Sequence, residues 1–266
     1  MRRVVFLDID GTLIDVPAGL SEPSIYTKYA INELIKNGDL VFIATGRFKG
    51  NIPEIIKSLN PSGYITSNGA YIEYEGKELY SKEFNKDVFN DVRKFCLDNN
   101  CLFTGESQDF VYTPSIDQRF LDYLKKWKIE YVKYTNDDNN KFYKCCVFLN
   151  NISLRNDFEK KIGPIADARA QTADPEALAY DINEIGINKG FAVNKVIEML
   201  NIDKNNTYCF CDGINDLELI KACKYSYAME NGDDKVKNIA FGQTYSAIKD
   251  GVYRKLVEIG LIKGIS

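Results

Sequence analysis

The sequence predicts an α/β protein with a doubly wound, mostly parallel core sheet and an inserted α+β domain. Short apolar runs alternate with segments of helical periodicity, which is the pattern of a sheet covered by helices on both faces. Several of these runs end in glycine and polar residues, where open α/β sheets bind their ligands. Between residues 82 and 183 the alternation gives way to mixed strands and helices, so we expect the insertion there.

The first apolar run, Val4–Leu7, predicts a buried central strand that is followed by Asp8, Asp10 and Gly11. Two carboxylates two positions apart leave the same face of an extended chain. Gly11 permits a sharp turn or a close approach of the backbone to a ligand. Acidic residues that merely end a strand before an ordinary loop would explain one aspartate, but they explain two aspartates followed by Gly-Thr poorly.

The core continues in the same alternation on both sides of the insertion. Its further predicted strands are 40–44, 64–66, 207–211 and 225–229, with a hairpin over 71–80. Its predicted helices are 24–37, 52–59, 189–200, 217–220 and one that opens at Asp250-Gly251-Val252. Three of these strands end in the polar tips Thr45-Gly46-Arg47, Ser67-Asn68-Gly69-Ala70 and Asp212-Gly213-Ile214-Asn215-Asp216. We therefore expect a core domain of residues 1–81 and 184–266.

The inserted region, residues 82–183, predicts a smaller domain with its own apolar core. Its apolar spacing predicts helices around 88–96, 120–127 and 154–162, and strands within 101–113, 144–149 and 165–182. The polar stretch 135–141 is expected to be a solvated loop.

Composition and charge exclude several classes of function. The 266-residue chain has no histidine, which rules out a Ser-His-Asp triad, phosphohistidine chemistry and histidine-ligated zinc. A net charge of −4 without a basic stripe argues against nucleic acid as the main partner. Seven cysteines without a regular framework predict reduced thiols. No apolar stretch is long enough to span a membrane and the first strand follows Met1 closely, so we expect a cytoplasmic protein without a membrane partner.

The clustered carboxylates suit phosphoryl transfer. A carboxylate can attack a phosphoryl group and split its hydrolysis into two easier steps, which makes Asp8 the candidate nucleophile. Asp10 is the candidate general acid and base. If both gather with Asp212 and Asp216, repulsion would raise some of their pKa values unless a cation neutralises them. Oxygen ligands favour Mg²⁺, which we expect as the cofactor.

Four motifs, in this order, resemble those of the haloacid dehalogenase (HAD) superfamily. They are Asp8-x-Asp10-Gly11-Thr12, Thr45-Gly46-Arg47, Lys189-Gly190 and Asp212-Gly213-x-Asn215-Asp216. More narrowly, the chain resembles the Cof-like sugar-phosphate phosphatases, whose type IIB α+β cap is inserted between the second and third motifs. Other stretches that look like family features are Asn68-Gly69-Ala70, Asn231 and Asp250-Gly251-Val252. The resemblance implies a Rossmann-like core, a cap over 82–183, and a Mg²⁺-dependent phosphatase that acts through an aspartyl-phosphate.

The resemblance also implies a role for each matching residue. The metal ligands would be the Asp8 carboxylate, the Asp10 backbone carbonyl and Asp212, with Asp216 in support. The residues expected to bind phosphate are Thr12, Thr45, Gly46, Arg47, Asn68, Lys189 and Asn215, and Lys189 would also pair with Asp8. Structural alternatives remain, because Thr45, Asn215 and Asp216 could cap helices, and Lys189 and Arg47 could be surface residues of a first helical turn.

Specificity and some local details are left open by the sequence. Cys211 stands before Asp212, where the family usually has glycine, and we expect local adjustment rather than lost activity. Arg169 is the candidate for binding a second anionic or polar substrate group, although an exposed arginine between strands is an equal alternative. We expect a small phosphorylated metabolite as partner and a monomer or weak homodimer. The alternative functions are a phosphomutase and a catalytically idle metabolite-binding regulatory module.

Overall fold

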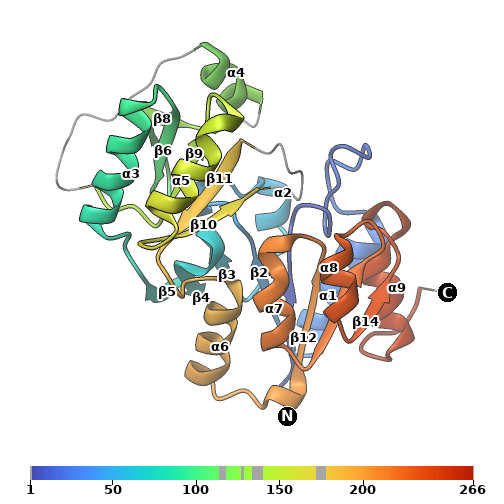
Figure 1. The fold of residues 1–266 in the computed structure, drawn as a ribbon. Coiled ribbons are helices and arrows are strands. Elements are labelled where there is room, and N and C mark those ends of the chain that lie inside the picture. The colour runs from blue at the N-terminus through green and yellow to red at the C-terminus, as the bar shows by residue number, and fades with distance from the viewer. Residues whose placement is uncertain (1, 114–117, 127–128, 134–139, 172–177, 266) are drawn as a thin grey trace. The chain divides into compact units, whose positions relative to one another are not determined.

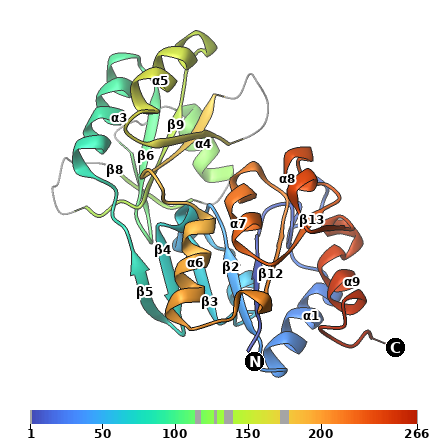
Figure 2. The same cartoon turned by 60° about the horizontal axis from the view of Figure 1, so that its bottom comes forward.

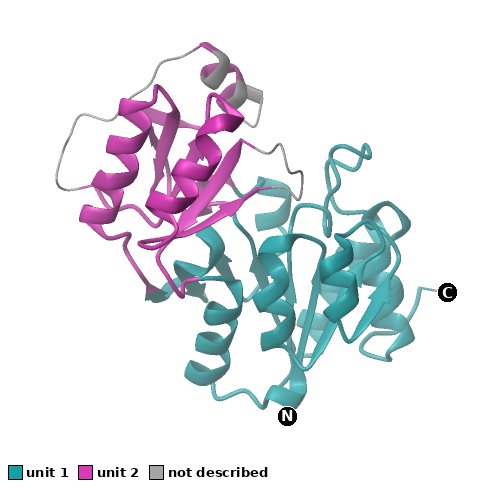
Figure 3. Ribbon diagram, viewed as in Figure 1, with its two compact units in different colours: residues 1–46, 52–80, 188–266 teal, residues 47–51, 81–187 magenta. Residues whose placement is uncertain are grey.

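The computed structural model describes residues 2–113, 118–126, 129–133, 140–171 and 178–265 (Figure 1). The chain forms two compact units (Figure 3). Unit 1 comprises Met1–Gly46, Ile52–Tyr80 and Asn188–Ser266, and unit 2 comprises Arg47–Asn51 and Ser81–Ile187. Each unit has a sheet and an apolar core of its own.

Unit 1 is built on an eight-stranded sheet in the order β14-β13-β12-β1-β2-β3-β4-β5. The strands are β1 Val4–Leu7, β2 Leu40–Ala44, β3 Gly63–Thr66, β4 Tyr71–Tyr74, β5 Lys77–Ser81, β12 Thr207–Cys211, β13 Tyr225–Met229 and β14 Gly242–Thr244. Pairing is parallel from β14 to β3, and β4 is antiparallel to β3. The strand that precedes Asp8 is therefore central, with β12 on one side and β2 on the other.

Helices cover both faces of this sheet, because strand residues alternate between two apolar clusters. Val5 and Leu7 of β1 lie in one cluster, with residues of α1 (Ile25–Lys36), α2 (Glu54–Lys57) and α9 (Gly251–Glu258). Val4 and Phe6 lie in the other, with residues of α6 (Lys189–Met199), α7 (Leu217–Ala222) and α8 (Asp234–Ile239). Helices α6 and α7 run side by side (Figure 2). The predicted doubly wound, mostly parallel core is confirmed.

Unit 2 contains a six-stranded sheet in the order β10-β11-β9-β6-β7-β8, antiparallel except between β7 and β8. The strands are β6 Leu102–Glu106, β7 Val111–Thr113, β8 Tyr131–Lys133, β9 Lys144–Phe148, β10 Asp167–Ala170 and β11 Ala179–Asn183; the helices are α3 Lys86–Asp98, α4 Gln118–Lys126 and α5 Arg155–Ile162. The core of unit 2 joins side chains of α3 and α5 to one face of the sheet. This is the α+β insertion that the sequence predicts.

A few elements differ from the prediction. The helix predicted over 52–59 is only the short α2, because Pro53 cannot continue a helix backwards and serves as its N-cap. Strands β8 and β14 were not predicted. Helix α8 was not predicted either, because it buries only Val236 and shows no apolar periodicity. Most of the predicted loop 135–141 and the end of the helix predicted over 120–127 lie outside the described residues.

The state of the cysteines agrees with the prediction from the sequence. All seven are buried and unpaired, and Cys211 packs in the cluster that faces α6 and α7. None of the described helices is both long and apolar enough to cross a membrane.

Because the cores are separate, a cavity in one of them should weaken that unit. Phe158 is fully buried in unit 2, with its ring 5.3 Å from that of Phe95 and 5.0 Å from that of Tyr180. We expect Phe158→Ala to lower the free energy of unfolding by about 3–5 kcal/mol. Hydrogen exchange should show lost protection in β9 and β11 but not in β1. The exposed Phe110→Ala is the control, and equal loss of protection in β1 would contradict two separate cores.

Candidate active site

The candidate site lies at the carboxyl ends of four neighbouring strands of unit 1. Strands β12, β1, β2 and β3 are consecutive in the sheet and run parallel. Asp212, Asp8, Thr45 and Ser67 each follow the last residue of one of them. The Asp8 amide donates to Phe210 O over 3.1 Å, which extends the β1–β12 pairing by one residue. Parallel pairing thus brings the polar tips to one edge of the sheet.

A buried lysine joins two of the acids. The Lys189 ammonium donates to Asp8 Oδ1 and to Asp216 Oδ1, each over 2.6 Å, and the Lys189 side chain is fully buried. Lys189 stands in the first turn of α6, where the Asn188 side chain caps the helix by accepting from the Phe191 amide. Burial alone would lower the pKa of Lys189, but Asp216 and Asp8 raise it above its ordinary value. The side chain therefore remains an ammonium.

The negative charge of the clustered carboxylates exceeds the single positive charge of Lys189. Asp8, Asp212 and Asp216 each offer an oxygen within 4.8 Å of the others. Burial raises the pKa of Asp8, which Asp216 and Asp10 raise further and Lys189 opposes. Burial and then Asp8 and Asp216 raise the pKa of Asp212. A set of oxygen donors with uncompensated negative charge fits a hard divalent cation.

The three carboxylates differ in how many oxygens are already bonded. Asp216 Oδ1 accepts from Lys189 and Asp216 Oδ2 accepts from the Gly213 amide over 3.1 Å, so both of its oxygens are used. Asp212 Oδ1 accepts from the Thr12 hydroxyl over 3.2 Å. Asp216 is therefore best placed to position Lys189, whereas Asp8 and Asp212 keep more oxygen acceptors for a ligand.

Gly11 is required where the first two tips meet. Its φ is +77°, and a Cβ built on it would lie 2.0 Å from Asp212 Oδ2. The Gly11 carbonyl accepts from the Asn231 side-chain amide over 2.8 Å, and Asn231 Oδ1 accepts from the Ala247 amide over 3.2 Å. Asn231 thus fixes the loop that follows Asp10.

A second group of polar residues lies at the tips of β2 and β3. The Asn68 amide donates to the Thr45 carbonyl over 3.2 Å, and the Asn215 side-chain amide donates to Asn68 Oδ1 over 3.3 Å. A Cβ at Gly46 would lie 2.8 Å from Asn68 Oδ1, which explains the glycine. Ser67 and Asn68 have φ values of 50° and 55°. Such backbone strain is typical of functional sites.

Three other predicted site residues are Asp10, Arg47 and Arg169. Asp10 is exposed at the turn after β1. Arg47 belongs to unit 2, where its guanidinium donates to the Asn51 carbonyl over 3.1 Å. Arg169 also belongs to unit 2 and forms a bidentate pair with Asp167. Ser67 is predicted from the sequence only as part of a polar strand tip, because nothing in its residue type indicates its positive φ.

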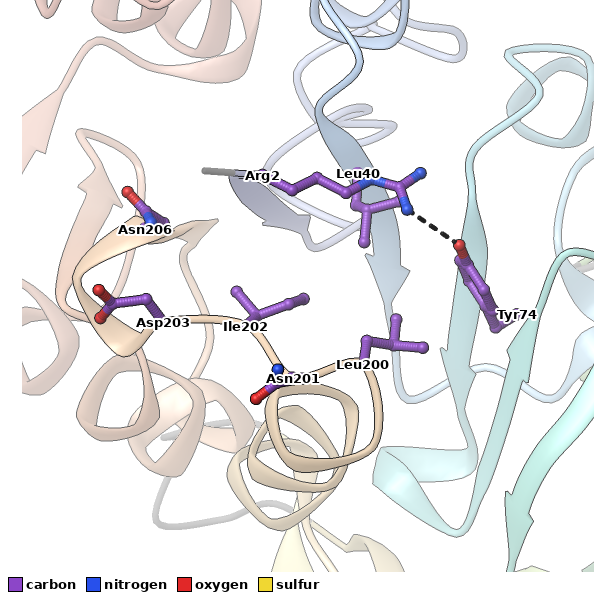
Figure 4. A pocket seen from close by; sticks show the side chains of 8 residues that line it. All are labelled: Arg2, Leu40, Tyr74, Leu200, Asn201, Ile202, Asp203 and Asn206. Atoms are coloured by element: carbon purple, nitrogen blue, oxygen red, sulfur yellow. Dashed lines mark hydrogen bonds between the residues drawn. The ribbon is translucent and has the colours of Figure 1, made fainter.

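A cavity of about 350 Å³ lies at the other end of the sheet of unit 1 (Figure 4). It is lined by Arg2, Leu40, Tyr74, Leu200, Asn201, Ile202, Asp203 and Asn206. Leu40 is the first residue of β2, whose last residue precedes Thr45. None of the predicted site residues lines this cavity.

Known proteins resemble the chain along almost its whole length. It is 27% identical over 269 residues to YkrA of Bacillus subtilis, covering 98% of this chain and 99% of that protein. It is 26% identical over 263 residues to the 5-amino-6-(5-phospho-D-ribitylamino)uracil phosphatase YcsE of Bacillus subtilis, covering 96% and 94%.

Solved structures share the fold. The HAD subclass IIB sugar phosphatase BT4131 superposes with a TM-score of 0.85 at 22% identity, covering 98% of this chain and all of that one. The phosphatase BT1666 from Bacteroides thetaiotaomicron gives a TM-score of 0.83 at 21% identity, with 98% and 96% covered.

Similarity to a known family extends over nearly the whole chain, not only over the four motifs. Residues 5–256 match the haloacid dehalogenase-like hydrolases. The match includes most of the strand before Asp8, the insertion and the tip that carries Asp212 and Asp216. The chain therefore belongs to the haloacid dehalogenase-like hydrolase family.

Proposed function

We propose that the protein is a Mg²⁺-dependent phosphomonoesterase that hydrolyses small phosphate esters through an aspartyl-phosphate on Asp8. The observation that carries the proposal is the Asp8 carboxylate, buried at the tip of β1 and bonded to Lys189 beside Asp212. The lysine keeps positive charge next to the attacking oxygen, and the fixed strand tip orients that oxygen. The phosphatase name of the relative YcsE supports the same reaction class.

The reaction would proceed in two displacements at phosphorus. An Asp8 carboxylate oxygen attacks the phosphorus, and the ester bond to the alcohol oxygen breaks as Asp10 gives that oxygen a proton. Asp10 then takes a proton from water, whose oxygen attacks the phosphorus. The bond to Asp8 breaks, which frees inorganic phosphate and restores both carboxyl groups. The exposed position of Asp10 suits this exchange of protons with alcohol and water.

The cation would be held by Asp8, Asp212 and the backbone carbonyl of Asp10. When bound, Mg²⁺ would neutralise charge on the transferred phosphoryl oxygens. Asp216 would act by holding Lys189 rather than by binding the cation directly, since both of its oxygens accept hydrogen bonds from the protein.

The phosphate oxygens would be bound by the two polar groups at the strand tips. Thr45 and Thr12 offer hydroxyls, Gly46 an unobstructed backbone N–H, and Asn68 and Asn215 side-chain amides. The hydrogen bond between Asn215 and Asn68 holds these two side chains together before substrate binds. Such preorganisation lowers the entropy cost of positioning the phosphoryl group.

The nucleophile is tested by Asp8→Asn. We expect the rate of inorganic phosphate release from p-nitrophenyl phosphate with Mg²⁺ to fall about a thousand-fold or more, because the amide cannot form the phosphoenzyme. Asp234→Asn, an exposed aspartate of unit 1, should keep the wild-type rate. Retained activity in Asp8→Asn would refute the mechanism. A wild-type protein that isomerises phosphate esters without releasing phosphate would be a mutase instead.

The metal site is tested by thermal unfolding with and without Mg²⁺. The pKa values of Asp8 and Asp212 are raised in the folded protein, so these two groups bind more protons in the folded state than in the unfolded one. Their contribution to the stability of the metal-free protein is therefore lost as pH rises above about 4. Protons and the cation compete for the same oxygens. At one fixed Mg²⁺ concentration, the stabilisation should therefore be larger at about pH 8 than at about pH 5.5, and it amounts to about 1.4 kcal/mol when that concentration is ten times Kd.

Asp212→Asn is the matched variant for this experiment. It removes one of three crowded carboxylates, so the metal-free variant should be at least as stable as the wild type at about pH 8. It should also lose the Mg²⁺-dependent rise in melting temperature. A variant that keeps the rise would place the cation elsewhere.

A further inference from the structure

The turn of residues 230–233 connects β13 to α8 and contacts two acid-bearing strand tips of unit 1. The Asn231 side-chain amide donates to the Gly11 carbonyl over 2.8 Å, and the Asp233 backbone amide donates to the Asp212 carbonyl over 2.8 Å. One short turn is thus hydrogen-bonded both to the loop that follows β1 and to the tip of β12.

The two tips that this turn joins are also in contact with each other. The Thr12 hydroxyl donates to Asp212 Oδ1 over 3.2 Å. Gly232 packs against the same tip, since a Cβ there would lie 2.9 Å from both the Cα and the carbonyl oxygen of Asp212. Asp212 is therefore held by the loop after Asp10 and by the turn together. A displacement of the turn would move both segments that are proposed to hold the cation.

Gly11 depends on hydrogen bonds to other residues because its own backbone is permissive. Its φ of +77° is one of several conformations open to glycine, which has no Cβ to exclude the others. The Gly11 amide donates to the Ile14 carbonyl over 2.7 Å, and its carbonyl accepts from Asn231. The Asp10 carbonyl, which is proposed as a metal ligand, shares a peptide plane with the Gly11 amide. A fixed Gly11 therefore fixes the direction of that carbonyl.

The turn is itself held by the segment that follows β14. Asn231 Oδ1 accepts from the Ala247 amide over 3.2 Å, and Glu230 Oε2 accepts from the Ser246 amide over 3.2 Å. The Lys249 ammonium donates to the two Glu230 carboxylate oxygens over 3.1 and 3.0 Å. The Asn231 amide thus uses its donor on one segment and its acceptor on another, which leaves the amide plane little freedom.

Asn231 is an exposed residue although both ends of its side chain are bonded. A hydrogen bond at an exposed position contributes little to the free energy of unfolding, because water readily replaces either partner. The bonds of Asn231 therefore matter more for the local geometry of the Gly11 loop than for the stability of the fold. Its role can be separated from folding by substitution.

We propose that Asn231 is a positioning residue for the cation, which acts by fixing the Gly11 carbonyl relative to Asp212. The proposal rests on the Mg²⁺-dependent function proposed above and adds a residue that acts through the backbone of the metal-binding loop. Removing a residue that orients metal ligands typically changes metal affinity or activity about 10- to 100-fold. Aspartate cannot replace Asn231, because it offers no donor to the Gly11 carbonyl.

The first test measures Mg²⁺ binding through the rise in melting temperature across a Mg²⁺ titration without substrate. We expect Asn231→Ala to raise the Kd for Mg²⁺ about tenfold or more, since the Asp10 carbonyl is no longer held in place. The Mg²⁺ concentration that gives half the maximal rate with p-nitrophenyl phosphate should rise by a similar factor. At saturating Mg²⁺, kcat should stay within about fivefold of the wild type. Asn238→Ala, at an exposed position of α8, should behave as wild type.

The second test measures hydrogen exchange in the metal-free protein and does not depend on activity. Asn231→Ala should lose protection at the backbone amides of residues 11–14 and keep it in β12, because only the loop loses a hydrogen bond. Asn231→Asp keeps the acceptor for the Ala247 amide and removes the donor to Gly11. It should therefore show the same loss of protection, and it serves as the second variant if Asn231→Ala folds poorly.

The outcomes separate positioning from a structural role and from the reaction itself. A wild-type Kd for Mg²⁺ in Asn231→Ala, with or without a lower melting temperature, would overturn the positioning role and leave the phosphatase intact. Unchanged protection at residues 11–14 in both variants would overturn it as well. A wild type that neither binds Mg²⁺ nor releases phosphate would overturn the proposed function, and this inference with it.

Discussion

The ion pairs of Lys189 with Asp8 and Asp216 are the interaction on which the rest of the site depends. A fully buried ammonium requires carboxylates, and the carboxylates at these strand tips would repel one another without it. The geometry follows from the fold. Lys189 reaches the tips because α6 starts beside them, and the Asn188 cap fixes that start. Gly190 lets α6 approach α7 closely, since a Cβ there would lie 2.2 Å from Glu218 O. Helix packing thus sets the position of the charge.

The same arrangement of buried charges lowers the stability of the folded protein. The pKa values of Asp8 and Asp212 are raised by burial, so ionising them works against folding. Positive φ at Ser67 and Asn68 adds strain. The fully buried strand β1, with apolar side chains on both faces, offsets these terms, because each such side chain contributes about 1.5–3 kcal/mol. The buried apolar side chains of β1 thus stabilise the sheet directly next to the acids that destabilise it.

Much of the core site was predictable because it depends on local pattern. A short apolar strand followed by acids places Asp8 and Asp212 at strand tips, and parallel pairing makes adjacent tips meet. Backbone conformation and register across distant segments were not predictable. Nothing in the residue types marks the strain at Ser67. The cluster around Lys144 arises only when β6, β9 and β11 pair in one register, which brings Glu106 opposite Lys144 and Asp181 opposite Cys146. A shift of one residue would turn these side chains into the apolar core.

Lys189 and Lys144 are both buried and each is paired with two carboxylates, but the two clusters differ in how the carboxylates are arranged. Lys189 binds its carboxylates from one side, so oxygens of Asp8, Asp212 and Asp216 still lie within 4.8 Å of one another. Lys144 instead lies between Glu106 and Asp181, with its Nζ 3.3 Å from an oxygen of each. Among the described residues, only the first cluster brings three acidic ligands within that distance. A cation therefore suits the first cluster, whereas the second can offer only separate acceptors.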